Sequence, residues 1–200
     1  MKLFTSSNLL HEPLIKINEW IEEAVNLEVP LPHAMNLSTV DVLGQPSSRM
    51  VLLKSISDEG MTFYTDYESQ KGQMLEDNPK AALNFWWAKT DKQIRVEGIC
   101  IKTSEEDSDE YFLSRPRDSQ ISASASIQSK VINSYEELLK RAKFLEEKTS
   151  GKAIKRPKRW GGYRLIPHKI EFWINQPNRL HQRELFTLES NKWEKTLLSP

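Results

Sequence analysis

Short segments of alternating apolar and polar residues constrain the fold of this chain more than any other feature. They begin at residue 34 and are separated by turn residues, such as those at 44–46 and 58–60. Successive side chains of a strand leave opposite faces of the sheet, so each segment predicts a strand with one buried face. The predicted strands cover residues 34–42, 47–56, 61–66, 80–88, 92–104, 162–167, 169–175, 181–189 and 192–198.

Helical periodicity and capping residues predict four helices. Residues 13–26 carry an apolar stripe at i, i+3, i+4 and i+7, and a second helix begins at Ser69 and stops before Pro79. Residues 105–115 have acids at the front and Pro116 after the end, whereas residues 134–151 open with a capping-box serine. Helices and antiparallel strands together predict an α+β, barrel-like fold in one domain, residues 1–200, with a helix from the first 33 residues packed on it.

Composition excludes several classes of protein. The 28 basic and 28 acidic residues cancel, which argues against nucleic-acid or membrane partners, and 38% hydrophobic content is enough for a core. The only cysteine, Cys100, lies in a strand pattern and is predicted to be a packed thiol. The four histidines lack metal-ligand spacing, so no metal is expected. Without a long apolar run or an apolar segment at its start, the chain is expected to be soluble and cytoplasmic.

The segment EFWINQPNRLHQR, residues 171–183, is the strongest candidate for a ligand site. Arg179, His181 and Arg183 alternate, so on a strand their side chains share one face. Three basic groups side by side repel one another unless an anion lies between them, which favours a phosphorylated ligand. A plain basic strand face is the alternative.

Further candidates are spread along the chain. Arg49 and Lys54 flank an apolar run, and their spacing predicts opposite faces of a regular strand. The start of the helix at Ser69, with Lys71 beside it, is either a phosphate seat or an ordinary cap. Gln93 either faces a heterocycle or lies beside a surface pair of Arg95 and Glu97.

A long polar stretch, residues 111–129, contains few large apolar residues. Such a stretch inside a compact unit predicts either a mobile surface loop or a ligand-binding loop, and the ligand-binding loop is favoured here. The motifs GxSxG and GxGxxG are absent, so hydrolase and nicotinamide-dehydrogenase functions lack support.

The motifs RMVLLK, FYTDYESQKG, QIRVEG, SRPRDSQI and NRLHQR occur in this order between residues 49 and 183. With Trp193 and the closing residues 197–200, they resemble the pyridoxine (pyridoxamine) 5′-phosphate oxidase family over roughly residues 34–200. The resemblance implies an FMN-binding split β-barrel, antiparallel and Greek-key-like, with flanking helices. It also implies a homodimer with active sites at the interface, and oxidation of a phosphorylated B6 vitamer to pyridoxal 5′-phosphate by O2.

The resemblance assigns roles to individual residues. It implies FMN contacts from Arg49, Met50, Val51, Leu52, Leu53, Lys54, Tyr64, Thr65, Gln70, Lys71, Gln93, Gln128, Ser129, Trp173 and Arg183. It implies substrate contacts from Lys54, Tyr111, Arg115, Ser119, Arg179, Leu180 and His181, with Arg179 and His181 as the catalytic pair.

Departures from the family pattern bear on affinity and substrate. Gln70 stands where an arginine is usual, so weaker FMN binding is expected. Ser122 and Ser124 replace a usual glycine and aromatic residue, and the short start lacks an arginine-bearing segment found in some members. The sequence SQKG also occurs in phenazine-biosynthesis flavin oxidases. These oxidases and a non-catalytic flavin-binding split-barrel protein are the alternatives.

Overall fold

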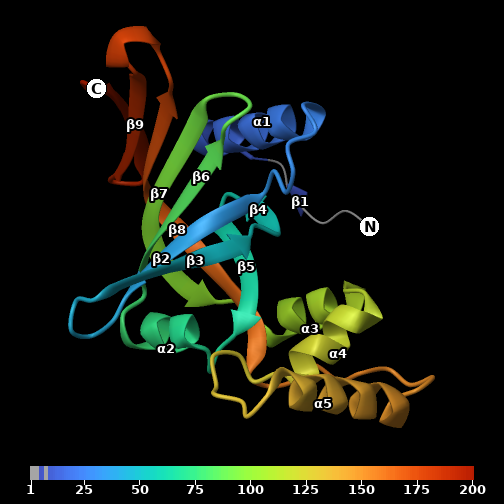
Figure 1. Ribbon diagram of the computed structural model, residues 1–200. Helices are drawn as coiled ribbons and strands as arrows, with labels where there is room; N and C mark the ends of the chain where they lie inside the picture. The colour runs from blue at the N-terminus through green and yellow to red at the C-terminus, as the bar shows by residue number, and fades with distance from the viewer. Residues whose placement is uncertain (1–4, 7–8) are drawn as a thin grey trace.

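A curled antiparallel sheet forms the centre of the computed structural model, which describes residues 5–6 and 9–200 (Figure 1). Its central strands follow the order β1-β4-β5-β8-β7-β6-β2-β3, and the β9–β10 hairpin continues from β8. All pairs are antiparallel except β1 with β4. The strands are β1 (Thr5–Ser6), β2 (Ala34–Val40), β3 (Pro46–Leu52), β4 (Ser55–Ser57), β5 (Gly60–Asp66), β6 (Lys80–Trp87), β7 (Lys92–Lys102), β8 (Trp160–Ile174), β9 (Gln182–Glu189) and β10 (Lys192–Leu197).

The predicted strand at 47–56 is two strands, because the chain changes partner in its middle. Leu53 donates its N–H to the carbonyl of His33 at 2.9 Å, next to β2. Lys54 donates to the carbonyl of Thr62 in β5 at 2.8 Å. Since β3 and β4 lie toward opposite ends of the strand order, this step brings the two ends of the curled sheet together.

The predicted strands at 162–167 and 169–175 are a single strand, β8. Its pairing with β7 shifts by one residue, since Gly98 lies opposite Pro167 and Glu97 lies opposite Lys169. His168 is the extra residue of this β-bulge. Proline has no N–H to give to a ladder and is tolerated at bulges, so the strand passes through Pro167 without ending.

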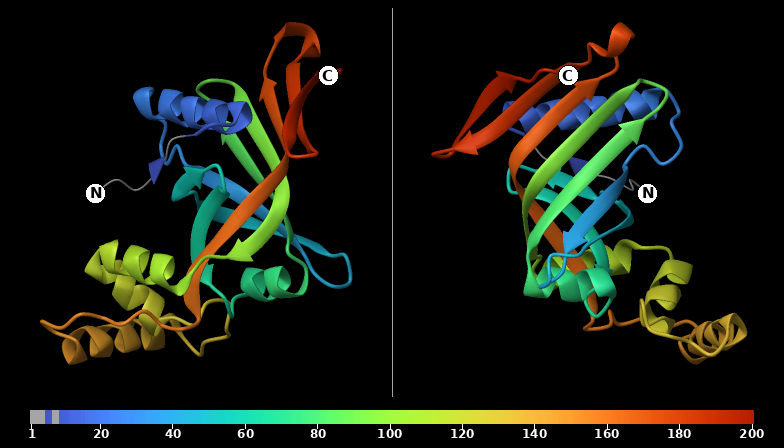
Figure 2. Two further views of the ribbon diagram at one scale, coloured as in Figure 1. Left: turned by 180° about the vertical axis from the view of Figure 1, so that it is seen from behind. Right: turned by 60° about the vertical axis from the view of Figure 1, so that its left-hand side comes forward.

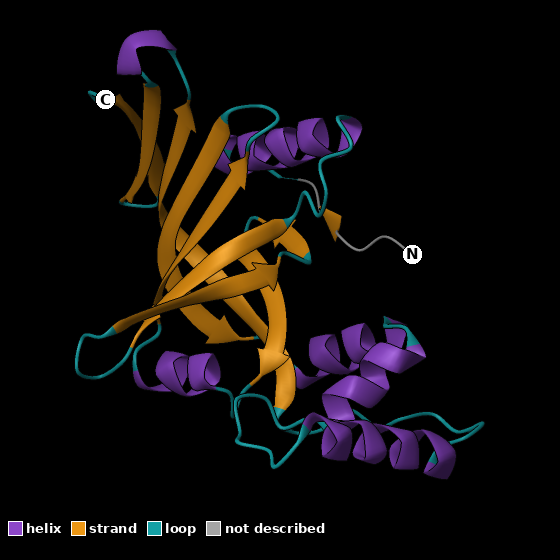
Figure 3. Ribbon diagram, viewed as in Figure 1, coloured by secondary structure: helices purple, strands orange, loops and turns teal. Residues whose placement is uncertain are grey.

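Serine caps start three of the helices. The hydroxyls of Ser69, Ser104 and Ser134 each accept the N–H of the third residue that follows, as predicted for Ser69 and Ser134. The helices are α1 (Glu12–Asn26), α2 (Gln70–Asp77), α3 (Glu105–Ser114), α4 (Arg117–Ala125), α5 (Tyr135–Lys148) and the 3-10 turn η1 (Pro177–Arg179). Figure 3 shows α3, α4 and α5 gathered at one end of the sheet.

Helix α4 corrects the prediction of a loop over residues 111–129. Its serines do not compete with the helix, because the hydroxyls of Ser122 and Ser124 donate to carbonyls four residues earlier, both at 2.8 Å. Ile121 is buried and ties the helix to its neighbours. The polar composition therefore belongs to a packed helix.

Two hydrophobic cores stabilise the molecule. The main core joins the inner face of the sheet to α1, through residues that include Ile17, Ile21 and Phe63. It contains Cys100, whose pKa burial raises to about 12, so the predicted packed thiol is confirmed. A smaller core lies among α3, α4, α5 and the start of β8 (Figure 2). It consists of Phe112, Ile121, Ile154 and Trp160.

In the part of the chain that the structure describes, no helix is long and apolar enough to cross a membrane.

Candidate functional site

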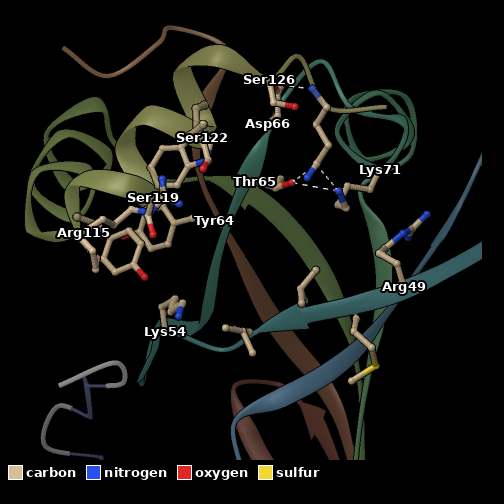
Figure 4. A pocket seen from close by; sticks show the side chains of 18 residues that line it. Arg49, Lys54, Tyr64, Thr65, Asp66, Lys71, Arg115, Ser119, Ser122 and Ser126 are labelled. Carbon is tan, nitrogen blue, oxygen red and sulfur yellow. Dashed lines mark hydrogen bonds between the residues drawn. The ribbon is translucent and has the colours of Figure 1, made fainter. Parts of the chain in front are cut away.

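A cavity of about 720 Å³ lies between the curled sheet and the α3–α4 helices. Strands β3 and β5 form one wall, the start of α2 closes one end, and α3, α4 and the start of β8 form the other wall (Figure 4). Its lining residues are Arg49, Met50, Val51, Leu52, Lys54, Tyr64, Thr65, Asp66, Lys71, Tyr111, Arg115, Pro116, Ser119, Ser122, Ala123, Ser126, Gln128 and Trp160.

Lys71 marks the end of the cavity nearest α2. Its side chain is only 8% exposed, and its ammonium donates to Gln128 Oε1 at 2.6 Å and to Thr65 Oγ1 at 3.2 Å. Burial and the nearby Arg49 lower its pKa to about 8, against the opposing effect of Asp66. Asp66 is itself ion-paired with Arg159 at 3.0 Å. Lys71 is therefore a cation held by neutral acceptors.

Arg49 extends from β3 toward the same end of the cavity. Its guanidinium donates to the carbonyls of Leu37 and Ser47 and to the hydroxyls of Thr39 and Ser47, at 2.8–3.2 Å. All four acceptors are neutral, and burial lowers the Arg49 pKa. Neither cation is ion-paired with a carboxylate of residues 5–6 or 9–200, and two such cations at one end suit an anion such as a phosphate.

A second pair of cations lies at the other end of the cavity, as Figure 4 shows for Lys54 and Arg115. Burial and the charge of Arg115 both lower the pKa of Lys54, so these two cations lie close together. Within residues 5–6 and 9–200, Arg115 Nη1 is buried and has no hydrogen-bond partner. Buried donors are usually paired, so this nitrogen indicates a place for an acceptor.

The structure corrects the prediction that Arg49 and Lys54 lie on opposite faces of one regular strand. Both line one cavity, because the chain leaves β3 after Leu52 and Lys54 joins β5. Leu53, between them, lies in the main core instead. Gln70 and Ser129 are exposed and are not among the lining residues.

The remaining predicted residues gather elsewhere, on the face shared by β6, β7, β8 and β9. Trp86 lies opposite Gln93, Gln93 opposite Trp173, and Trp173 opposite Arg183. Directly paired residues point to the same side of a sheet, so these four form one row, hereafter the cross-strand row. Gln93 donates to Asn84 Oδ1 at 2.8 Å, and the alternative in which it lies beside an Arg95–Glu97 pair is not formed, because Arg95 pairs with Glu171.

The tip between β8 and β9 carries Arg179, Leu180 and His181. The prediction that Arg179, His181 and Arg183 alternate along one strand is wrong, because β9 begins at Gln182. Arg179 belongs to η1 and has a φ of 62°, so the chain turns there. The His181 ring lies 4.5 Å from that of Trp173, and its Nδ1 accepts the N–H of Gln176 at 3.2 Å.

Glu171 supplies an anion for one of the three basic residues of this segment, Arg183. Its buried carboxylate accepts from Arg183 Nε at 2.8 Å and from Arg95 Nη1 at 3.0 Å. Arg95 therefore pairs with Glu171, whereas Glu97 pairs with Lys169 at 3.3 Å. In Figures 1 and 2 the β8–β9 tip and the α3–α5 helices lie at opposite ends of the molecule.

Some of the residues that line the cavity were not predicted from the sequence. Ser122 and Ser126 lie on the same side of α4 as the predicted Ser119, because the three follow a helical spacing of three and four residues that the prediction of a loop concealed. Trp160 lies outside all the motifs identified in the sequence. Its place in the cavity follows from tertiary packing of the small core.

A curled antiparallel barrel and a cavity with two pairs of cations define a class of protein, a split-barrel protein whose site suits anionic ligands. The model of the family described as pyridoxamine 5′-phosphate oxidase matches residues 21–196. The chain belongs to this family.

Relatives agree with this assignment. The pyridoxine/pyridoxamine 5′-phosphate oxidase of Acaryochloris marina is 47% identical over 188 residues, which cover 94% of this chain and 86% of that protein. The Haemophilus influenzae protein of the same name is 43% identical and covers 100% of this chain and 95% of its own length.

Two solved structures have the same fold. PhzG from Burkholderia lata, in complex with tetrahydrophenazine-1-carboxylic acid, superposes with a TM-score of 0.91 at 33% identity, covering 96% of this chain and 95% of that chain. A pyridoxamine 5′-phosphate oxidase-related, FMN-binding protein from Nostoc punctiforme has a TM-score of 0.77 at 16% identity, with 96% and 99% coverage.

Proposed function

We propose that this protein is an FMN-dependent oxidase that converts pyridoxine 5′-phosphate or pyridoxamine 5′-phosphate to pyridoxal 5′-phosphate, with O2 as electron acceptor. The observation that carries the proposal is the pair of cation sites, Arg49 with Lys71 and Lys54 with Arg115, in one cavity. A phosphorylated cofactor and a phosphorylated substrate would each need one of them.

The α2 end of the cavity fits the phosphate of FMN. Arg49 and Lys71 supply charge, while Thr65 and Gln128 already hold the Lys71 ammonium in place. When bound, FMN would supply a two-electron acceptor that takes a hydride from the substrate and passes the electrons to O2. The residues of β3 from Met50 to Leu52 line the wall between the two cation pairs and would support its ring.

The other end fits the substrate phosphate. Lys54 and Arg115 supply two cations, and Ser119 and Tyr111 line the same end and supply hydroxyls. A phosphate fixed there would hold the reacting carbon at a constant place in the cavity. Positioning of this kind is the main contribution that a protein makes to hydride transfer.

A second copy of the chain completes the site in this proposal. Arg179, Leu180, His181 and the cross-strand row are remote from the cavity of their own chain. Their surface is partly apolar, since Trp86 is 49% exposed and Leu180 is 69% exposed. In a homodimer, this surface of one copy would cover the cavity of the other, and Arg179 and His181 would act on the bound substrate.

Sedimentation tests the dimer. The FMN-loaded protein is expected to sediment at twice the 23.3 kDa of one chain. Trp86→Glu should sediment as a monomer and lose most activity, because a carboxylate would be buried at the interface without a partner. Circular dichroism must show that this variant is folded. A monomeric, fully active parent would contradict the shared site.

Hydrogen peroxide production tests the reaction. Purified protein loaded with FMN should release peroxide when given either phosphorylated vitamer, with pyridoxal 5′-phosphate formed in equal amount. A yellow protein that makes no peroxide from either vitamer would refute the oxidase and leave a non-catalytic flavin-binding protein.

Oxidation of a phenazine precursor is the second candidate function, favoured by the TM-score of 0.91 with PhzG. The 43–47% identity to B6-vitamer oxidases and the paired cations at Lys54 and Arg115 favour the phosphorylated vitamer. Tetrahydrophenazine-1-carboxylic acid, tested in the same peroxide assay, separates the two functions. A higher kcat/KM for it would reverse the assignment.

Gln70 gives a prediction about cofactor affinity. Gln70→Arg adds a cation next to Lys71 at the start of α2 and is expected to tighten FMN binding about tenfold, the lower end of what one charge-assisted hydrogen bond contributes. Turnover at saturating FMN should stay unchanged. Titration of the apo-protein with FMN gives the dissociation constants, and equal values would show that position 70 lies outside the cofactor site.

A further inference from the structure

Arg115 is held in the cavity by aromatic rings. In the described part of the chain it forms no ion pair with a carboxylate, and its Nη1 is buried without a hydrogen-bond partner. Its Cζ lies 4.5 Å from the centroid of Trp160 and 5.8 Å from that of Phe112. The Trp160 distance is well within the range of a cation–π contact.

Trp160 is itself firmly placed. It is 6% exposed, and its backbone N–H donates to the carbonyl of Pro157 at 2.9 Å while its carbonyl accepts from Arg156 at 2.7 Å. The ring packs edge-on against Phe112 at 5.3 Å. It lies nearly parallel to Tyr64 at 5.5 Å.

Tyr111 belongs to the same stack. Its ring lies 3.9 Å from that of Tyr64 and is tilted by only 6° from the plane of Trp160, at 6.3 Å. The stack of Tyr64, Tyr111 and Trp160, with Arg115 on Trp160, therefore joins two of the residues proposed to bind the substrate phosphate. The Trp160 side chain contacts Arg115 through the face of its ring.

An aromatic face suits this arginine better than a carboxylate would. A carboxylate would occupy the N–H donors at the edge of the guanidinium and neutralise its charge, both of which a phosphate needs. A ring attracts the cation through its face and leaves the donors in the guanidinium plane free. We propose that Trp160 is a positioning residue that fixes Arg115 for the substrate phosphate. This inference rests on the proposed function.

Two substitutions of Trp160 test the proposal. Trp160→Leu removes the aromatic face and should raise the KM for pyridoxine 5′-phosphate about tenfold, with kcat within about twofold of the parent. Trp160→Phe keeps an aromatic face, so its KM should stay within about threefold of that of the parent. The dissociation constant of inorganic phosphate, measured by calorimetry on FMN-loaded protein, should rise with the KM. The proposal would be overturned if the KM of Trp160→Phe rose as much as that of Trp160→Leu. It would also be overturned if Trp160→Leu left the KM unchanged.

An Arg115→Ala background separates positioning from general support of the fold. If Trp160 acts through Arg115, Trp160→Leu should lower kcat/KM about tenfold in the parent and by less than twofold in Arg115→Ala. An equal loss in both backgrounds would mean that Trp160 only supports the small core, which refutes the inference. Should Trp160→Leu not fold, the smaller loss caused by Trp160→Phe is compared in the same two backgrounds.

Trp20→Leu is the matched control. Trp20 is buried in the main core, 5.0 Å from Phe172 and outside the cavity lining, so this variant should lower the melting temperature and leave KM unchanged. A parent that oxidises neither vitamer would refute the proposed function alone. The phosphate titrations of the parent and the Trp160 variants would still test the positioning of Arg115.

Discussion

Lys71→Met is expected to weaken FMN binding about 10- to 100-fold. The variant removes a buried ammonium that faces the proposed phosphate site, and a charge-assisted hydrogen bond contributes about 1.5–3 kcal/mol. Turnover at saturating FMN should change far less than affinity. Titration of the apo-protein measures the effect, and Lys80→Met, an exposed lysine on β6, is the matched control. Equal affinities for Lys71→Met and the parent would place the cofactor phosphate elsewhere.

The pH dependence of FMN binding provides an independent test of the same residue. The pKa of Lys71 is lowered to about 8 without ligand, mainly by burial. A phosphate dianion favours the charged ammonium, so it raises this pKa, and binding takes up a proton above pH 8. FMN affinity should therefore fall as pH rises through 8, by up to about tenfold per pH unit. In Lys71→Met this slope should disappear, and a slope that survives would assign the proton to another group.

Arg115→Ala is expected to lower kcat/KM for phosphorylated vitamers about 100-fold or more. Nη1 of this guanidinium is buried at the substrate end of the cavity without a hydrogen-bond partner among the described residues. Its loss also leaves Lys54 as the only cation at that end among the lining residues. The loss should fall mainly on KM, because the phosphate is remote from the reacting carbon. Parallel assays with unphosphorylated pyridoxine measure the contribution of the phosphate.

Two comparisons make the Arg115 prediction specific. Arg141→Ala, which removes a surface arginine paired with Glu137 on α5, should leave kcat/KM unchanged. Activity with unphosphorylated pyridoxine is expected to be low in the parent and to change little in Arg115→Ala. An equal loss for phosphorylated and unphosphorylated substrates would show that Arg115 supports the cavity and does not bind phosphate.

Much of the fold could be predicted from sequence because the signals were local. Alternation of residue type located the strands, and serine caps located the starts of α2 and α5. The step from β3 to β4 could not be predicted, since residues 50–53 form a continuous apolar run and the change of partner depends on where the sheet ends meet. Helix α4 was missed because its serines have weak helix propensity, and it is the buried Ile121 that ties it to the small core.

The candidate site could also be predicted only as far as local sequence signals reach. The stretches that contain Arg49, Lys71 and Arg115 were identified from residue types, but their distribution between the two ends of one cavity required the fold. The turn at Arg179 depends on positive φ angles at residues 178 and 179, which a strand pattern does not reveal. Glu171 lies in a strand eight to twelve residues before the basic residues, and only the pairing of β8 with β9 brings it to Arg183.

The presence of two separate cores has a consequence for hydrogen exchange. One wall of the cavity belongs to β3 and β5, which are part of the main sheet, and the other belongs to helices supported by a core of only four buried side chains. Helix α5 contributes no buried residue to either core. Backbone amides of α4 and α5 should therefore exchange through a local opening much faster than those of β5 and β8. A ligand that contacts both walls would slow hydrogen exchange in α4 most, because binding would stabilise this helix against local opening.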